Sequence, residues 1–297
     1  MRYHAYVVGL ALLLVASVRT ASGADTPPSA MVLYVAFPTL DADTPSTVAG
    51  RLMVPRSTRR AARKPPAVLI LHGSAGVDTR GPLMANALLQ VGIATFEIDM
   101  WTPRRLRDGV NSVPRRAIEV LPDAFGALKF LSSLPLIDPA RIGITGFSLG
   151  GAVSMLTASK PLADQYGLPG LRFRAHAALY PVCWAYNSPQ RPQYVFKELT
   201  GAPVLIQGGD LDTYDEPDSC QKLVESLPDT SRQLVRLKMY PGATHKFDAA
   251  EPAHVFQDPA ANLGRGGEVR VVPNPAAAEM ARDATARFFV EAFGVSQ

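Results

Sequence analysis

The sequence predicts an α/β protein with a mostly parallel central sheet, an antiparallel N-terminal edge and helices on both faces. Two alternating segments, 31–37 and 47–55, indicate an antiparallel strand pair. The continuous apolar run 67–72 is typical of a strand buried on both faces. After it, strand-like and helix-like segments alternate, and this order produces a mostly parallel sheet covered by helices.

The remaining elements follow in chain order. After residue 72 we expect a helix at 81–90, strands at 93–99 and 141–145 with a helix at 117–134 between them, a helix after Ser148, strands at 174–180, 203–208 and 233–240, and a closing helix at about 275–293. Ligands of such sheets bind at the carboxyl ends of the strands. Candidate functional residues are therefore those just after each strand.

The N-terminus has the pattern of a secretory signal peptide. Arg2 and His4 precede an apolar run at 5–18, and small residues follow it. An uncleaved membrane anchor is the alternative, but the run is short for a bilayer. We expect a signal peptide at 1–24 and one domain at 25–297, exported to the periplasm or secreted.

Composition and charge argue against a polyanionic partner. The chain has 297 residues, 47% of them hydrophobic and 19% charged, as in a globular domain with a substantial core. The formal net charge is +4, and Arg2 and Arg19 of the leader supply two of those charges. The basic run 56–64 lies between two predicted strands, which favours a solvated loop. We expect neither a nucleic-acid partner nor stable membrane association after cleavage.

The stretch "GFSLG", residues 146–150, matches G-x-S-x-G between a predicted strand and a helix. Its turn must be tight enough to hold the Ser148 hydroxyl clear of the backbone. A side chain at Gly146 or Gly150 would collide with a neighbouring strand or helix. The pattern predicts Ser148 as a nucleophile, and a plain N-cap serine is the alternative.

A nucleophilic serine needs a base and then a carboxylate, in the chain order serine, acid, histidine. His72 ends a predicted strand and His176 lies inside one. His245 follows the last predicted strand, on the turn "YPGATHKFD". We predict His245 as the base, with His254 as the alternative.

The acid is expected after the strand 203–208, where the chain reads "GGDLDTYDEPD". The pattern G-x-x-D read from Gly209 selects Asp212. Asp210 is the alternative, and Asp215 could cap the next helix.

Two backbone N–H groups should stabilise the oxyanion of the tetrahedral intermediate. One belongs to Leu149, the residue after the nucleophile. The other is expected in "LHGSAGVD", after the strand 67–72, where Ser74 is the candidate. Ordinary turn chemistry at His72 and Gly73 is the alternative.

With these residues, the chain resembles the dienelactone hydrolase family of α/β-hydrolases. The segments "LILHGSAGV", "GITGFSLGG", "ALYPVCW", "GGDLDTYDEPDSC", "YPGATHKFD" and "NPAAAEMARDATARFF" carry the resemblance, in order, over nearly all the mature chain. It implies an α/β-hydrolase fold without a large lid, ester or lactone hydrolysis, and no metal or organic cofactor. It supports Ser148, Asp212 and His245 as the triad.

The chain departs from the founding members of that family at two places. They use a cysteine nucleophile and carry a glutamate in the loop after the first buried strand. Here these places hold Ser148 and the pair Gly73–Ser74. We therefore expect an ordinary serine hydrolase and not dienelactone as its substrate. The segment 246–272 is longer than expected, and could cover the site or form a surface loop.

The resemblance also bears on the two cysteines, Cys183 and Cys220. In relatives with similar "YPVCW" and "DTYDEPDSC" stretches the two positions are placed to pair, since adjacent strands bring them close. It implies a Cys183–Cys220 disulfide, and two buried thiols are the alternative.

Four further residues are candidates for substrate contact. In "MWTPRR", Trp101 and Arg104 follow a predicted strand and would stand at the mouth of the site. Arg104 could bind a substrate carboxylate or be solvated. Trp184 and Tyr214 near other strand ends could form an aromatic wall or simply pack.

These features favour an exported serine hydrolase that cleaves a small-molecule ester or lactone through an acyl-enzyme. An acyltransferase or peptidase could use the same triad. A non-catalytic binding module on a hydrolase scaffold is a third possibility. The complete set of nucleophile, acid, base and oxyanion loop argues for the first. The sequence predicts no oligomeric state.

Overall fold

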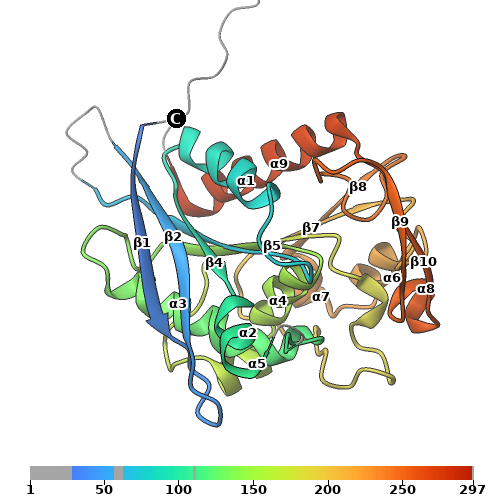
Figure 1. The fold of residues 1–297 in the computed structure, drawn as a ribbon, viewed down its shortest axis with the longest axis horizontal. Coiled ribbons are helices and arrows are strands. Elements are labelled where there is room, and N and C mark those ends of the chain that lie inside the picture. Colours follow the sequence, from blue (N-terminus) through green and yellow to red (C-terminus); the bar gives the residue numbers. More distant parts are fainter. Residues whose placement is uncertain (1–28, 57–62, 110–111, 296–297) are drawn as a thin grey trace, which may run out of the picture.

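The computed structural model describes residues 29–56, 63–109 and 112–295. The predicted signal peptide at 1–24 and most of the basic run 56–64 lie outside the described residues. Figure 1 shows one twisted sheet with helices on both faces, which confirms the predicted fold class.

The central sheet has eight strands, in the order β1-β2-β4-β3-β5-β6-β7-β8. β2 runs antiparallel to both β1 and β4, and every other neighbouring pair is parallel. The strands are β1 (Ala30–Pro38), β2 (Thr47–Pro55), β3 (Ala67–Leu71), β4 (Ala94–Asp99), β5 (Ile142–Phe147), β6 (His176–Leu179), β7 (Val204–Gly209) and β8 (Val235–Tyr240). The antiparallel N-terminal edge is thus confirmed.

Helices cover the two faces of the sheet. In Figure 1, α1 and α9 lie above the sheet, and α3, α4 and α5 lie below it. The helices and helical turns are α1 (Arg80–Gln90), α2 (Thr102–Asp108), η1 (Ala117–Val120), α3 (Leu121–Ser133), α4 (Leu149–Ala158), α5 (Lys160–Tyr166), η2 (Cys183–Ala185), α6 (Ser219–Glu225), α7 (Asp229–Arg232), α8 (Ala261–Gly264) and α9 (Pro275–Phe293). None of the described helices is both long and apolar enough to cross a bilayer.

The continuously apolar sequence of β3 is explained by its burial on both faces of the sheet. Leu69 and Leu71 pack in the cluster shared with α3 and α4. Val68 and Ile70 point to the other face and pack with α1 and α9. Because side chains alternate along a strand, burial on both faces requires every position to be apolar.

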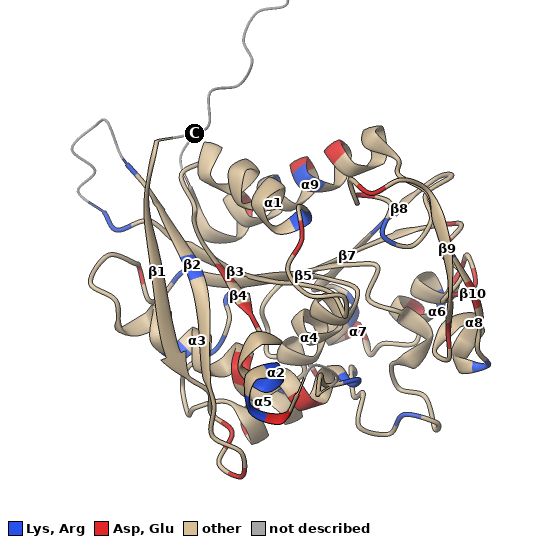
Figure 2. Cartoon of the chain, viewed as in Figure 1, with Lys and Arg blue, Asp and Glu red and all other residues tan. Residues whose placement is uncertain are grey.

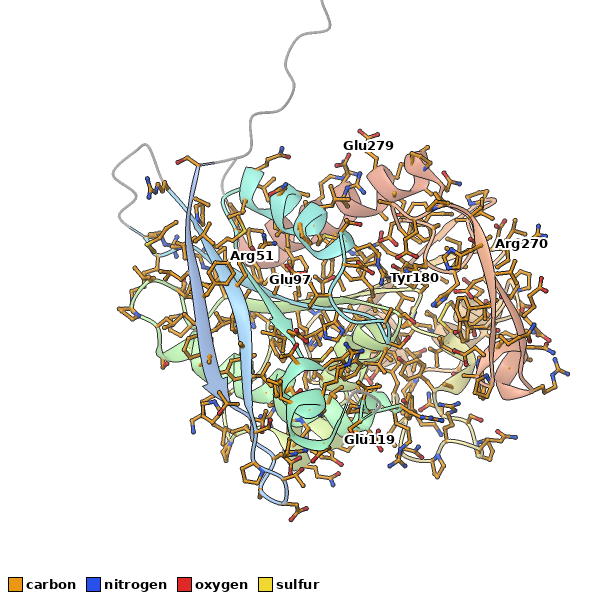
Figure 3. The ribbon with its side chains drawn as sticks, in the orientation of Figure 1. Arg51, Glu97, Glu119, Tyr180, Arg270 and Glu279 are labelled. Carbon is orange, nitrogen blue, oxygen red and sulfur yellow. A yellow bond between two sulfur atoms is a disulfide. The ribbon has the colours of Figure 1, made fainter. Side chains whose placement is uncertain are left out.

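Charged side chains avoid the middle of the sheet. β3, β5 and β7 carry no charged residue, and Figure 2 draws uncharged residues such as these in tan. Glu97 of β4 is buried, and its Oε2 accepts a hydrogen bond from Arg51 Nη2 of β2 at 2.9 Å (Figure 3). The pair compensates the charge in the interior, although burial still raises the pKa of Glu97.

Two expected elements differ in the structure. The helix expected at 117–134 is divided into η1 and α3, because Pro122 lacks an N–H and fits only the first turn of a helix. The segment 246–272, for which the sequence predicts a cover of the site or a surface loop, contains a hairpin of β9 (His254–Asp258) and β10 (Gly267–Val271).

Candidate active site

Ser148 lies at the sharp turn between β5 and α4. Its φ of 51° is in the left-handed region, which costs a non-glycine residue backbone energy. Its N–H donates to Leu179 O of β6 at 2.9 Å. The strained turn raises the hydroxyl above the carboxyl end of the sheet, as a nucleophile requires.

The flanking glycines make this turn possible. A Cβ at Gly146 would lie 2.4 Å from the carbonyl group of Gly150. A Cβ at Gly150 would lie 2.4 Å from the carbonyl oxygen of Leu71 in β3. Glycine is therefore required at positions 146 and 150, because helix and strand approach too closely there for a side chain. This agrees with the prediction from the sequence.

The structure brings Ser148, His245 and Asp212 together, although they follow three different strands. The Ser148 hydroxyl donates to His245 Nε2 at 2.9 Å, and His245 Nδ1–H donates to Asp212 Oδ2 at 2.7 Å. The side chains of His245 and Asp212 are each 4% exposed. Water is thus kept from the ion pair that forms when the imidazole takes a proton.

The other candidate acids have different tasks. Asp210 Oδ1 accepts from Gly242 N at 2.7 Å and closes a turn between two loops. Asp215 accepts from the N–H groups of Cys183 and Trp184 at 2.7 and 2.8 Å. Asp215 therefore caps η2, which precedes it in the chain, and not the next helix. The alternative base, His254, is exposed on β9.

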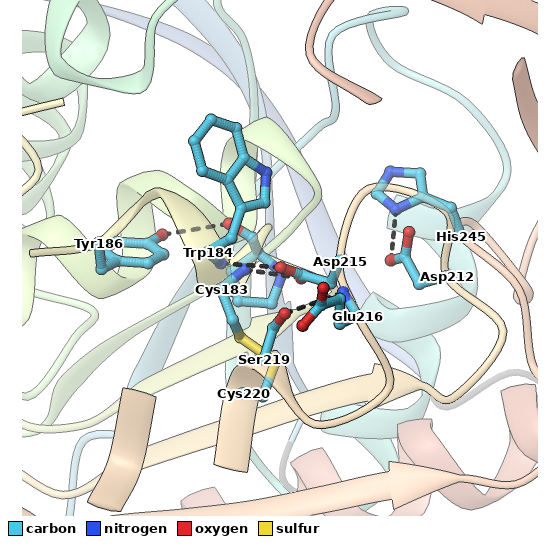
Figure 4. The surroundings of a disulfide bond; sticks show 10 residues. Cys183, Trp184, Tyr186, Asp212, Asp215, Glu216, Ser219, Cys220 and His245 are labelled. Carbon is cyan, nitrogen blue, oxygen red and sulfur yellow. Dashed lines mark hydrogen bonds and ion pairs between the residues drawn. A yellow bond between two sulfur atoms is a disulfide. The ribbon is translucent and has the colours of Figure 1, made fainter. Parts of the chain in front are cut away.

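The cysteines form the expected disulfide, which joins η2 to α6 beside this capping carboxylate (Figure 4). Burial, and then the nearby Asp212 carboxylate, raises the pKa of Asp215 to about 7.

Among the described residues, the one cluster spaced for a metal ion is Cys183, Asp215 and Cys220. The sulfurs are bonded to each other and supply no thiolate there.

The oxyanion candidates Leu149 and Ser74 line one cavity with Ser148. Leu149 opens α4, so its N–H has no acceptor within the helix. Ser74 follows His72, whose Nδ1–H donates to Gly73 O at 2.7 Å and whose Nε2 accepts from the N–H of Met100 at 3.0 Å. Burial lowers the pKa of His72, which keeps the ring neutral in this role.

Trp101 and Arg104 do not stand at the mouth of the site. Trp101 is 1% exposed, and its indole N–H donates to Ser74 O at 2.8 Å. Arg104 is buried and binds both carboxylate oxygens of Asp123, at 2.7 and 3.0 Å. Neither residue lines the cavity beside Ser148. The expectation of direct substrate contact is corrected here: Trp101 supports the loop that carries Ser74, and Arg104 neutralises a buried carboxylate.

The two other aromatic candidates also separate. Tyr214 lines the cavity, its ring centre is 4.4 Å from that of His245, and its hydroxyl donates to Asp258 Oδ2 at 2.7 Å. Trp184 is not among the cavity-lining residues, and Arg191 lies over its ring at 4.9 Å. The expected aromatic wall is thus limited to Tyr214 from this pair.

The sequence reading missed a buried polar network beneath His245. Arg80 Nη1 donates to the Tyr180 hydroxyl at 2.9 Å, and that hydroxyl donates to Asp248 Oδ1 at 2.5 Å. Asp78 accepts from the same guanidinium. The Tyr180 ring, labelled in Figure 3, packs edge-on against His245 with 4.9 Å between the ring centres. No spacing rule points to these residues, because they meet only through tertiary packing.

The segment 246–272 forms one border of the cavity. Its hairpin buries Val269 and Val271 against Tyr214. Residues Asp258 to Ala260 line the cavity, which has a volume of about 640 Å³. The segment is therefore a side wall, while the strand β9 itself stays mostly exposed.

Comparisons with known proteins agree with this architecture. Similar solved structures are esterase 2 of Thermogutta terrifontis with propionate bound (TM-score 0.62, 14% identity, 92% of this chain and 98% of that chain) and Est1E of Butyrivibrio proteoclasticus (TM-score 0.56, 17% identity, 89% and 99%). A dienelactone hydrolase of Anabaena variabilis is similar at TM-score 0.54 and 19% identity, over 90% and 99%. At these identities the likeness shows the fold. A comparison with curated proteins finds no match.

The sequence model of the dienelactone hydrolase family matches residues 49–293, which is most of the chain and includes every residue of the site. The match agrees with the resemblance carried by the motifs around Ser148, Asp212 and His245. The chain therefore belongs to the dienelactone hydrolase family and is a hydrolase of the ester and lactone type with the α/β-hydrolase fold.

Proposed function

We propose that the chain is an exported serine hydrolase that cleaves carboxylic esters or lactones through an acyl-enzyme intermediate. The observation that carries the proposal is the continuous relay from Ser148 through His245 to Asp212. His245 takes the hydroxyl proton as Ser148 Oγ attacks the acyl carbon, and then donates it to the departing alkoxide. Asp212 orients the ring and stabilises the imidazolium.

The second half of the reaction repeats these steps with water. The water oxygen attacks the acyl carbon while His245 takes a proton from that water. His245 then gives this proton to Ser148 Oγ as the free acid leaves. In both halves, the N–H groups of Leu149 and Ser74 face the developing oxyanion. Each such donor typically lowers the barrier by about 3 kcal/mol.

Export is supported by two features of the chain. The N-terminal 24 residues have the signal-peptide pattern. The Cys183–Cys220 disulfide fits an oxidising compartment. Fractionation of expressing cells, with N-terminal sequencing of the mature protein, tests this part of the proposal.

The enzymatic part is tested with a fluorophosphonate probe and a short-chain p-nitrophenyl ester. We expect the probe to label Ser148 in peptide mapping, and Ser148→Ala and His245→Ala to lose labelling and about 10⁶-fold in kcat. His254→Ala is the matched control, because this histidine is exposed outside the relay. A wild-type protein that neither labels nor turns over the ester would favour the binding-module alternative.

A further inference from the structure

Two loops build a basic wall of the cavity beside Ser148. Arg115 and Arg116 lie just before η1, and Arg191 lies in the loop after η2. The loops are joined, because the Tyr194 hydroxyl accepts from Ala117 N at 2.8 Å. The three arginines thus lie on two loops that are bonded to each other, with Arg115 and Arg116 exposed at the border of the cavity.

The Arg191 guanidinium is held in place by aromatic rings. Its central carbon lies 4.9 Å from the ring centre of Trp184 and 5.7 Å from that of Tyr194. A stacked guanidinium is restrained by its face, while its N–H donors point outward along its edge. Arg191 is therefore preorganised to offer hydrogen bonds into the cavity that it lines.

Among the described residues, a protein carboxylate compensates one of the three arginines of this wall. Arg116 pairs with Glu119 at 2.8 Å. In the described ranges, no carboxylate oxygen lies within 4.0 Å of a side-chain nitrogen of Arg115 or Arg191. The one carboxylate among the described cavity-lining residues, Asp258, already accepts from the Tyr214 hydroxyl and from Ala260 N.

Several residues of the lining near the serine are apolar. Leu149 and Ala152 lie on α4 within one turn of Ser148, and Val182 and Ala185 border the same space. A ligand there meets apolar surface beside the nucleophile and two uncompensated guanidinium groups on the basic wall. One guanidinium group can donate two parallel hydrogen bonds to two oxygens of the same carboxylate or phosphate.

We infer that the cavity selects esters that carry an anionic group, a carboxylate or a phosphate-like oxyanion, bound by Arg115 and Arg191 while the ester carbonyl lies at Ser148. The inference rests on the proposed serine hydrolase function and narrows its substrate class. It makes Arg115 and Arg191 the residues that determine specificity.

A matched substrate series tests the inference. The p-nitrophenyl esters of straight acyl chains would be compared at equal chain length with three ends: methyl, carboxylate and phosphonate. We expect at least one anionic series to have about tenfold lower KM than the methyl series, with similar kcat, and the advantage to shrink in high salt. The carboxylate and phosphonate arms identify which anion the wall prefers. Equal KM values in all three series would overturn the inference.

Variants tie the preference to the named residues. In Arg115→Gln and Arg191→Gln, the KM ratio of methyl to anionic ester should fall towards one. Arg270→Gln removes the same charge from the exposed face of β10 (Figure 3), at a residue that does not line the cavity, and should keep the wild-type ratio. A ratio that survives both cavity substitutions would refute the inference while leaving ester hydrolysis intact. Absence of turnover for every ester, together with unlabelled Ser148, would overturn the proposed function and this inference with it.

Discussion

At the scale of single residues, the strained backbone of Ser148 explains why its hydroxyl lies within hydrogen-bond distance of His245. A φ of 51° costs a serine about 1–3 kcal/mol. The close approach of α4 to β3, possible only with glycines at 146 and 150, holds this conformation against that cost. The hydroxyl is consequently fixed within 2.9 Å of His245 Nε2 before any substrate arrives.

The choice between the two neighbouring aspartates can be tested directly. Asp212→Asn should lower kcat by about 10⁴ and leave KM nearly unchanged, because an amide cannot stabilise the imidazolium. Asp210→Asn is the matched control and should stay close to wild type, since among the described residues its carboxylate binds only Gly242 N. Steady-state kinetics on a p-nitrophenyl ester measure both, and a larger loss in Asp210→Asn would reverse the assignment.

At the scale of elements, the loop between β7 and α6 is anchored on three sides. Asp215 binds the backbone of η2, the disulfide joins η2 to α6, and Tyr214 binds the β9–β10 hairpin through Asp258. Asp212 lies two residues before Tyr214 in the chain, and its Oδ1 accepts from Tyr214 N at 3.0 Å. Its position against His245 therefore depends on contacts from elements that are distant in sequence.

The Asp215 anchor makes stability depend on pH. Its pKa is about 7 in the folded protein and near 3.8 otherwise. The folded state therefore binds this proton more tightly, so the stabilising contribution is complete below about pH 4 and is lost as pH rises through 7. We expect the free energy of unfolding of wild type, measured relative to Asp215→Asn by urea titration at each pH, to fall between pH 4 and 7.5. A constant difference across that range would contradict the assigned shift.

At the scale of the whole molecule, the strand order determines where the site lies. Ser148 follows β5, Asp212 follows β7 and His245 follows β8, and all three strands are parallel with their carboxyl ends at one edge. The helices α1 and α9 pack against one face of this sheet. A cavity between these helices and the sheet would therefore disturb the strands that position all three residues.

The C-terminal helix α9 offers a test of this dependence. Phe289 is fully buried, and a Cβ at Gly143 of β5 would lie 2.5 Å from its ring. Phe289→Ala should lower the free energy of unfolding by about 3–5 kcal/mol, because it leaves a cavity against the sheet. Glu279→Ala on the exposed side of the same helix (Figure 3) should change it by less than about 0.5 kcal/mol. Urea midpoints compare the two variants.

Local patterns predicted the elements whose sequence carries a strong period or a chemical motif. The antiparallel edge, the buried strand β3 and the helix α9 follow from side-chain alternation and helical spacing. The G-x-S-x-G turn and the order serine, acid, histidine identified Ser148, Asp212 and His245 as candidates. Short elements such as η1 and the β9–β10 hairpin were missed, since few residues define their pattern.

By itself, then, the sequence determined the α/β architecture, the strand ends that carry the chemistry and the residue types available there. Only the tertiary structure decided which neighbouring side chains face the cavity. Arg104 turned inward to Asp123, and Arg191 faces the cavity instead. The physical reason is that a side chain's partner is set by packing between elements distant in sequence, and no local spacing records which charge will need to be compensated.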